Sequence, residues 1–178
     1  INRKEYAAKT NLIPNRTQNK LFISREVRIL IQIQHPTIIQ FRGFSYFDFA
    51  GNKNITILMD YMKEGSLAEL IDKEQKGLSP GHYDNTKRQI ILAGVARGMM
   101  VLHSHHIIQR DLKPENILLD SELHPCITDF GLSKIFDPYH SMNQSTSDTG
   151  TAAYMAPEVI SSDKYNTKAD VYSFGILM

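Results

Sequence analysis

The sequence predicts an α+β protein whose first third is rich in strands and whose remainder is mostly helical. Two segments, Phe41–Phe47 and Ile55–Tyr61, have the length and the aromatic and β-branched content of strands, and a turn with glycine joins them. A short polar hinge follows at Lys63–Ser66. Beyond it, apolar side chains recur at the spacing of a buried helical stripe, as Leu92, Val95, Met99 and Leu102.

Composition and charge limit the classes of function. Of the 178 residues, 42% are hydrophobic and 22% are charged, which is typical of roughly one globular domain. The 20 basic and 19 acidic side chains nearly cancel, so we expect no nucleic-acid partner, and no apolar run is long enough to be a membrane segment. The single cysteine, Cys126, excludes an internal disulfide and favours a reducing, cytoplasmic (intracellular) location.

Both ends of the sequence indicate a part of a longer protein. The chain begins at Ile1 rather than at methionine, and it stops inside the apolar run Phe174–Met178. A complete domain rarely ends within such a pattern. We therefore expect a partial domain.

A helix is expected in the first part from about Thr17 to Gln34, where apolar side chains share one face and His35-Pro36 follows. Glu26 lies on that apolar face. Because a buried and unpaired carboxylate is costly, Glu26 either reaches solvent at the helix edge or pairs with a cation. Lys9, which ends the short apolar strand Tyr6–Ala8, is the cation that we expect to pair with it.

Polar residues flank two short apolar segments, Ile117–Leu119 and Cys126–Thr128. If these segments form an antiparallel hairpin closed by the loop at residues 120–125, Asn116 faces Asp129, with Cβ atoms ~5 Å apart. A carboxylate and an amide oxygen in that arrangement suit a hard cation such as Mg²⁺ shared with a phosphate. Taken singly, each residue is better explained as a turn former, whereas the combination with Lys9 and Glu26 favours the metal site.

From Lys9 to Met178 the chain resembles the eukaryotic protein kinases. The motifs that carry the resemblance occur in the order that the family has: YAAK ending at Lys9, Glu26 on its helix, RDLKPEN at 110–116, DFG at 129–131, APE at 156–158 and DVYSFG at 170–175. One such motif is weak support, whereas this many in order is strong.

The resemblance implies a two-lobed protein-kinase-like fold. A small antiparallel-sheet N-lobe with one helix would span residues 1–62, and a mostly helical C-lobe with the catalytic loop and activation segment would span residues 63–178. Both lobes would be incomplete. The first eight residues contain no glycine, so the glycine-rich loop is missing from this sequence, as are the last C-lobe helices.

Two features resemble particular branches of the family. KPEN at residues 113–116 is similar to serine/threonine kinases, and Gly150–Glu158 with Asp170–Gly175 is similar to the tyrosine-kinase-like branch. The resemblance implies a kinase that transfers the γ-phosphate of ATP to a serine or threonine hydroxyl of a protein substrate, in signalling. The alternatives are a pseudokinase scaffold and, more distantly, a small-molecule phosphotransferase with a kinase-like core.

The resemblance also implies roles for the residues of the catalytic loop and the metal site. Asp111 would orient the substrate hydroxyl and accept its proton, with Lys113 near the γ-phosphate. Asn116 and Asp129 would hold Mg²⁺.

Further residues are implied for nucleotide binding. Lys9, held by Glu26, would contact the α- and β-phosphates of ATP. The expected adenine contacts are Ala7 and Leu118, the backbone of Asp60 and Met62, and Met59 at the gatekeeper position.

Gln109 departs from the family pattern. The family usually has histidine at this position, packed against the phenylalanine that here is Phe130. Glutamine keeps a hydrogen-bonding end but loses the flat ring. We expect a somewhat weaker active assembly and no loss of a catalytic group.

The activation segment carries a polar stretch at residues 141–149 with five hydroxyl side chains and no apolar periodicity. Arg110, next to Asp111, occupies the position that family members use to grip a phosphate on this segment. We expect activation by an upstream kinase or by autophosphorylation in trans. The candidate phosphorylation sites are Ser145, Thr146 and Ser147.

Overall fold

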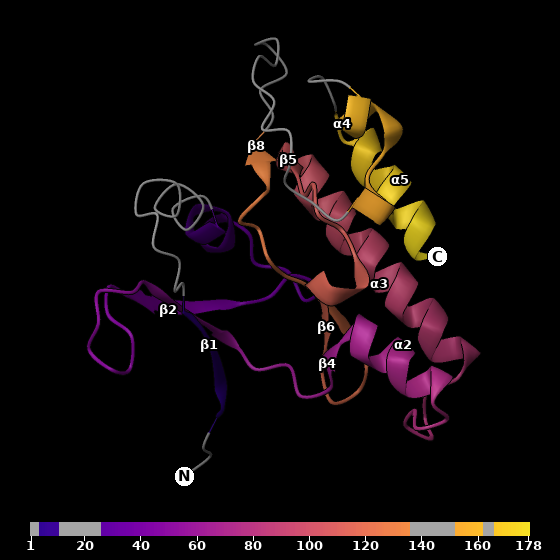
Figure 1. Cartoon of the computed structure of the whole chain (residues 1–178), viewed down its shortest axis with the longest axis horizontal. Helices are drawn as coiled ribbons and strands as arrows, with labels where there is room; N and C mark the ends of the chain where they lie inside the picture. Colours follow the sequence, from indigo (N-terminus) through magenta and orange to yellow (C-terminus); the bar gives the residue numbers. More distant parts are fainter. Residues whose placement is uncertain (1–3, 11–25, 136–151, 162–165) are drawn as a thin grey trace.

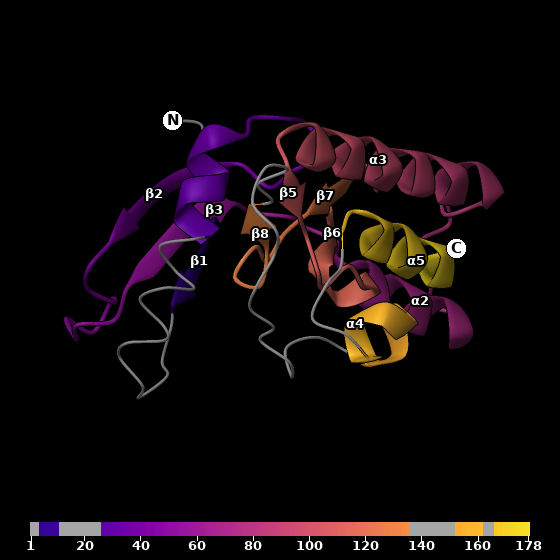
Figure 2. The same cartoon turned by 90° about the horizontal axis from the view of Figure 1, so that it is seen from above.

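The computed structural model describes residues 4–10, 26–135, 152–161 and 166–178. A small sheet lies on one side of the molecule and most of the helices lie on the other (Figure 1). The view from above separates the same two groups of elements, with short strands between them (Figure 2). This arrangement confirms the predicted α+β fold with a sheet-rich and a helical part.

The sheet of the first part has three antiparallel strands. They are β1 (Tyr6–Thr10), β2 (Phe41–Ser45) and β3 (Thr56–Asp60), in the order β1-β3-β2. All three strands expected here are therefore present; β2 and β3 are slightly shorter than predicted, and β1 extends past Lys9 to Thr10. Of the expected helix, residues 26–32 are helical and end before His35, while residues 17–25 lie outside the described part.

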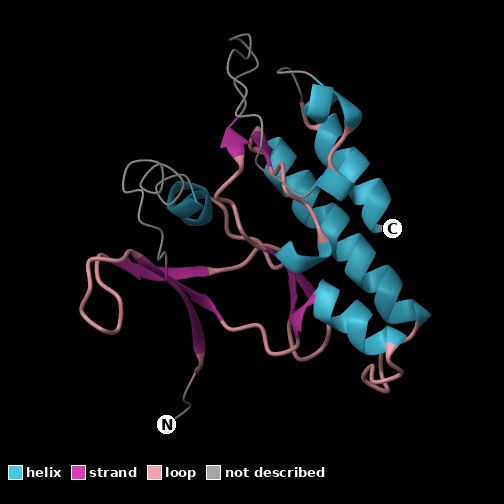
Figure 3. Cartoon of the chain, viewed as in Figure 1, coloured by secondary structure: helices cyan, strands magenta, loops and turns pink. Residues whose placement is uncertain are grey.

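The second part is built on helices, coloured cyan in Figure 3. The helices are α2 (Leu67–Gln75), α3 (Asn85–Ser104), α4 (Pro157–Ser161) and α5 (Lys168–Leu177). Side chains cap the N-termini of α2 and α3, because Ser66 accepts a hydrogen bond from the Glu69 N–H and Asp84 accepts one from the Lys87 N–H. None of the helices within the described ranges is both long enough and apolar enough to cross a membrane.

Short strands and two single 3₁₀ turns complete the described structure. They are β4 (Gly65–Ser66), β6 (Ile117–Leu119) and β7 (Pro125–Ile127) in one sheet, β5 (Ile107–Ile108) with β8 (Lys134–Ile135) in another, and the turns η1 (Pro114–Asn116) and η2 (Ala152–Tyr154).

The hairpin of β6 and β7 has a different register from the one that the sequence predicts. Leu118 lies opposite Cys126, and the Thr128 N–H donates to the Asn116 carbonyl at 2.9 Å. Asn116 therefore faces Thr128, and the predicted pairing of Asn116 with Asp129 is wrong by one residue. The turn causes the shift, because the Asp120 N–H donates to the His124 carbonyl at 3.1 Å and the return strand begins one residue earlier than expected.

One hydrophobic core runs through both parts. It includes Ile29 from the helix at residues 26–32, Met59 from β3, Leu102 from α3, Ile127 from β7 and the fully buried Phe130. Because the same core packs both parts, the helix that carries Glu26 and the segment that carries Asp129 are held at fixed positions.

Backbone hydrogen bonds reinforce this connection. The Ile39 N–H donates to the Ile127 carbonyl at 3.0 Å, and the Ile127 N–H donates to the Thr37 carbonyl at 2.9 Å. The segment that follows the first helix is thus attached to β7, two residues before Asp129. Cys126, partly buried on β7, packs against the core, as expected for a small packing residue.

Candidate active site

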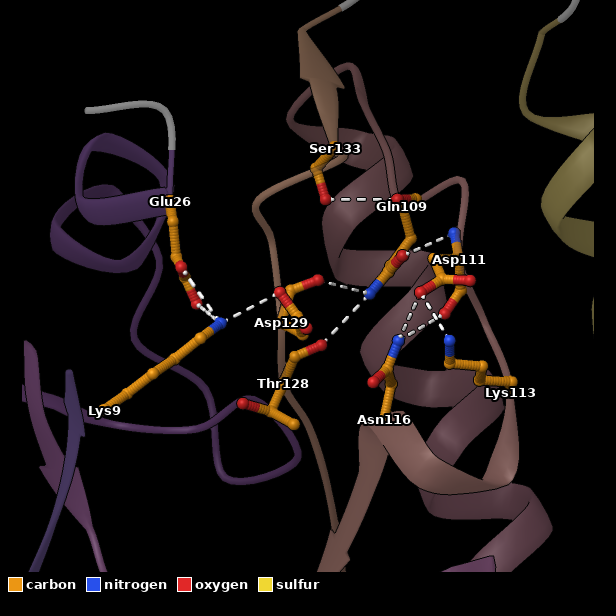
Figure 4. A network of polar contacts seen from close by, with 9 residues as sticks. All are labelled: Lys9, Glu26, Gln109, Asp111, Lys113, Asn116, Thr128, Asp129 and Ser133. Atoms are coloured by element: carbon orange, nitrogen blue, oxygen red, sulfur yellow. Dashed lines mark hydrogen bonds and ion pairs between the residues drawn. The ribbon is translucent and has the colours of Figure 1, made fainter. Parts of the chain in front are cut away.

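Lys9 on β1 is the centre of an ion-pair cluster. Its Nζ lies 2.9 and 3.2 Å from the two carboxylate oxygens of Glu26 and 3.0 Å from Asp129 Oδ1 (Figure 4). Only 2% of Glu26 is exposed, so the alternative in which Glu26 reaches solvent is wrong. The predicted ion pair between Lys9 and Glu26 is confirmed.

Burial and charge act in opposite directions in this cluster. Burial disfavours the Lys9 ammonium, but the attraction of Glu26 and Asp129 outweighs it and raises the pKa of Lys9. For Glu26, burial is the larger effect and raises the pKa of the carboxyl, while Lys9 offsets part of that rise. Lys9 is therefore protonated at neutral pH and supplies a fixed positive charge.

Asp111 is held by two neighbours on the catalytic loop. Asn116 Nδ2 donates to the Asp111 carbonyl at 2.8 Å and to Asp111 Oδ2 at 2.9 Å. Lys113 Nζ lies 2.9 Å from the same Oδ2. Pro114 starts the single turn η1, which brings Asn116 back toward Asp111. The three predicted residues of this loop are therefore in direct contact.

The catalytic loop is anchored to α5 through Asp170, which is 1% exposed. Its carboxylate accepts the N–H groups of Gln109 and Arg110, each at 2.9 Å, and lies 2.8 Å from His103 Nε2. Arg110 has a φ of 72°, a strained value for a residue with a side chain. The anchor holds that conformation. The sequence placed Asp170 in the DVYSFG motif but gave no signal for its contact with His103.

Asp129 leaves the β7 strand in a left-handed conformation, with a φ of 58°. This turn directs its side chain toward Lys9, and its backbone carbonyl toward Gln109 (Figure 4). The side chain of Asp129 is 44% exposed, so it is accessible to a ligand.

Asn116 and Asp129 fit a hard cation. Asn116 uses its Nδ2 for Asp111, and its amide oxygen is turned toward the segment with Thr128 and Asp129 (Figure 4). One carboxylate and one amide oxygen match the oxygen ligands of Mg²⁺, which usually takes few protein ligands and adds phosphate oxygens and water. Within the described ranges, no group of three or more His, Cys, Asp or Glu side chains could hold a metal ion.

Four of the residues expected around the adenine lie on the strands β1, β3 and β6, and the fifth, Met62, follows β3. Ala7 of β1 is opposite Met59 of β3, and Met59 is 4% exposed. Leu118 of β6 is half-buried and packs against the core. The Asp60 side chain is bound by Arg42 at 2.7 Å and by Lys4 at 3.3 Å, so the backbone is the part of Asp60 suited to a nucleotide. Met62 is also half-buried and packs against the core.

Comparison with known proteins identifies the family. A sequence model of the protein kinase domain matches residues 1–178. The chain belongs to the protein kinase family. The kinase motifs found in the sequence therefore have the structural setting of a kinase, with the DFG motif at residues 129–131 beside the catalytic loop.

Individual relatives agree with this membership. The kinase domain is 36% identical to cysteine-rich receptor-like protein kinase 6 of Arabidopsis thaliana, over 99% of this chain and 26% of that protein. It is 35% identical to serine/threonine-protein kinase VIK of Arabidopsis thaliana, over 94% of this chain and 38% of that protein. The chain thus spans about a quarter to two fifths of the length of these relatives.

The candidate phosphorylation sites Ser145, Thr146 and Ser147 lie outside the described residues. Arg110, the expected phosphate-binding residue, is described, and its Nη1 donates to the Leu132 carbonyl at 3.4 Å. The structure therefore leaves activation by phosphorylation as a prediction.

Proposed function

We propose that the protein is an ATP-dependent protein serine/threonine kinase that transfers the γ-phosphate of ATP to a hydroxyl of a protein substrate, in signalling. The observation that carries this proposal is the position of Asp111. Asn116 and Lys113 hold its carboxylate, and Asp111 and Lys9 lie on opposite sides of Asp129 (Figure 4). A base on one side and a cation on the other is the arrangement that phosphoryl transfer requires.

Each group contributes positioning or charge. Lys9, kept protonated and held by Glu26, binds the α- and β-phosphates. Asp111 orients the substrate hydroxyl and accepts its proton, and Lys113 lies beside it for the transferred phosphate. Asn116 and Asp129 would hold Mg²⁺, which supplies neutralisation of the phosphate charge when bound.

Selectivity for serine and threonine is supported by two observations. Lys113–Asn116 reads KPEN, as in the serine/threonine kinases that the chain resembles. One relative is named a serine/threonine-protein kinase. We further propose that the kinase acts in the cytoplasm and is activated by phosphorylation of the segment after Asp129, by an upstream kinase or in trans.

The second candidate is a pseudokinase, which Gln109 favours because it replaces the histidine that the family usually has. Against it, five residues expected to bind nucleotide and metal or to take part in transfer are all present: Lys9, Glu26, Asp111, Asn116 and Asp129. The hydrogen bonds of Gln109 also leave Asp111 and Asp129 in contact with their partners.

A transfer assay tests the proposal. Full-length protein is incubated with γ-labelled ATP, Mg²⁺ and a generic protein substrate, and the labelled product is hydrolysed to identify the phosphorylated amino acid. We expect label on serine or threonine, and its loss in Lys9→Met. Label on tyrosine would contradict the predicted selectivity, and nucleotide binding without any transfer would favour the pseudokinase.

A further inference from the structure

The side chain of Gln109 lies between the two loops of the site and is fully buried. Its Oε1 accepts the Asp111 N–H at 2.9 Å. Its Nε2 donates to the carbonyls of Thr128 and Asp129, each at 3.1 Å (Figure 4). One amide group therefore joins the backbone of the proposed base to the backbone of the proposed metal ligand.

The main chain of Gln109 is also fully bonded. Its N–H donates to Asp170 Oδ2 at 2.9 Å, and its carbonyl accepts from Ser133 Oγ at 3.2 Å. Gln109 is thus fixed to α5 through Asp170 and to the segment after the DFG motif through Ser133. The bond to Asp170 therefore fixes the backbone from which the Gln109 side chain reaches its partners, whereas the bond from Ser133 adds stability only.

The three backbone groups around the amide need two donors and one acceptor. A primary amide has two N–H donors and a carbonyl acceptor, so Gln109 satisfies all three. A neutral imidazole has only one donor and one acceptor, and an imidazolium has two donors and no acceptor. A carboxylate has no donor for the carbonyls of Thr128 and Asp129. Since buried polar groups without a partner are costly, glutamine fits this site better than histidine or glutamate.

We infer that Gln109 is a positioning residue that couples the geometry of Asp111 to that of Asp129. The amide accepts a hydrogen bond from the Asp111 N–H and donates one to the carbonyl of Asp129, a residue with a φ of 58°, so it contacts the backbone of both residues. The inference rests on the proposed transfer reaction for its effect on rate, but the coupling itself is a property of the folded protein. Gln109 is therefore an adapted replacement and not a deficit.

Three variants separate hydrogen bonding from packing. Gln109→Met keeps the length and most of the volume but has no N–H donor, Gln109→His keeps part of the hydrogen bonding, and Gln109→Glu keeps the shape but lacks the donors. The matched control is Ser133→Ala, which removes a buried hydrogen bond to the Gln109 carbonyl without touching Asp111 or Asp129.

The variants are compared in full-length protein by kcat, by the free energy of unfolding, and by the gain in ATP-analogue affinity on adding Mg²⁺. We expect kcat to fall about tenfold or more in Gln109→Met and Gln109→Glu and less in Gln109→His, because each lost bond loosens one loop. The gain from Mg²⁺ should shrink in the same order. Ser133→Ala should lower the free energy of unfolding but leave kcat and the gain in affinity from Mg²⁺ as in wild type.

Gln109→Met with wild-type kcat and an undiminished gain from Mg²⁺ would overturn the inference, as would losses in Ser133→Ala equal to those in Gln109→Met. If the Gln109 variants do not fold, hydrogen exchange of the wild type decides instead. The Asp111 N–H should then exchange as slowly as that of Arg110, which Asp170 binds. Fast exchange at Asp111 would show that the bond is absent.

Failure of the proposed function would look different. Wild-type protein would then transfer no phosphate. The gain in ATP-analogue affinity from Mg²⁺ would still shrink in the Gln109 variants, and the Asp111 N–H of wild type would still exchange slowly. The coupling by Gln109 and the transfer reaction are therefore tested separately.

Discussion

At the scale of single residues, the central feature is the fixed charge of Lys9. Lys9 contacts Glu26 and Asp129 together, and these carboxylates come from segments more than a hundred residues apart in the chain. The sequence predicts the partner Glu26, because a carboxylate on an apolar helix face needs a cation. It does not predict the contact with Asp129, which depends on the left-handed turn at that residue.

Replacement of Lys9 by methionine should destabilise the protein by about 1–3 kcal/mol at neutral pH. This is less than for a fully buried pair, because the Lys9 side chain is 37% exposed. The pKa of Glu26 is already raised by burial, and it rises further without Lys9. A carboxyl whose pKa is higher in the folded than in the unfolded protein stabilises the folded state fully at pH values below its unfolded pKa. This stabilisation is lost as the pH rises through the folded pKa.

Lys9→Met should therefore lose stability more steeply than wild type as pH rises above the ordinary pKa of a glutamate carboxyl, measured by denaturant unfolding. The control is the double variant Lys9→Met with Glu26→Gln, which has no carboxyl to titrate at position 26 and should be nearly insensitive over this range. Equal pH slopes in the single and double variants would contradict this account of the pair.

Cys126 should be an unreactive thiol. Burial raises the pKa of Cys126 to about 12, with a smaller contribution from Asp120. Alkylation at pH 8 should be about a thousandfold slower in folded protein than in guanidinium, where the pKa returns to its ordinary value near 8.5. Mass spectrometry of time points after adding iodoacetamide measures both rates at this single cysteine. Comparable rates would show that β7 opens readily.

At the scale of elements, the sequence predicts strands and helices better than it predicts register. Periodicity and turn residues located β2, β3 and most of the buried stripe of α3, because those signals are local; in α3 the buried residue at the start of the stripe is Ile91 and not the predicted Leu92. The register of β6 with β7 depends on how Asp120 closes its turn with His124, and one residue of difference moved Asp129 out of the ladder. The pattern of apolar residues does not determine which residues close a turn, so it does not determine the register.

Two glycines test the packing of the helices. A Cβ on Gly98 of α3 would lie 2.7 Å from Ile127 Cδ1 and 3.1 Å from the Thr37 carbonyl, whereas a Cβ on Gly175 of α5 would meet nothing within 4 Å. Gly98→Ala should therefore destabilise by about 1–3 kcal/mol, because overpacking outweighs the gain in helix propensity. Gly175→Ala should stabilise by roughly 0.5–1 kcal/mol.

Thermal unfolding of both variants beside wild type measures the difference. Opposite signs are expected. If Gly98→Ala is as stable as wild type, the helix α3 lies farther from the strand β7 and the segment at Thr37 than the structure has it, and the coupling between the two parts of the molecule would be weaker.

At the scale of the whole molecule, the site is assembled by a core that both parts share. The motifs gave the site residues in advance, because the chain resembles a family in which their roles are known. The links between them, from Gln109 to Asp129 and from His103 to Asp170, could not be predicted, because they join atoms that only the fold brings together.

Activity should depend on phosphate in the segment after Asp129. A phosphate at Ser145, Thr146 or Ser147 would carry about −1.5 to −2 charges and pair with the guanidinium of Arg110, next to Asp111. Mass spectrometry of active and phosphatase-treated full-length protein measures both occupancy and rate. Full activity after complete dephosphorylation, or in the variant with all three residues replaced by alanine, would exclude this mechanism.

The most direct test of the central claim separates transfer from binding at the two aspartates. Asp111→Asn should lower kcat at least about a thousandfold and leave the affinity for Mg²⁺ and ATP within about threefold, because Asp111 acts on the hydroxyl. Asp129→Asn should instead remove most of the affinity that Mg²⁺ adds. Turnover in Asp111→Asn equal to wild type, in full-length protein assayed with γ-labelled ATP and a protein substrate, would contradict the assignment of Asp111 as the base.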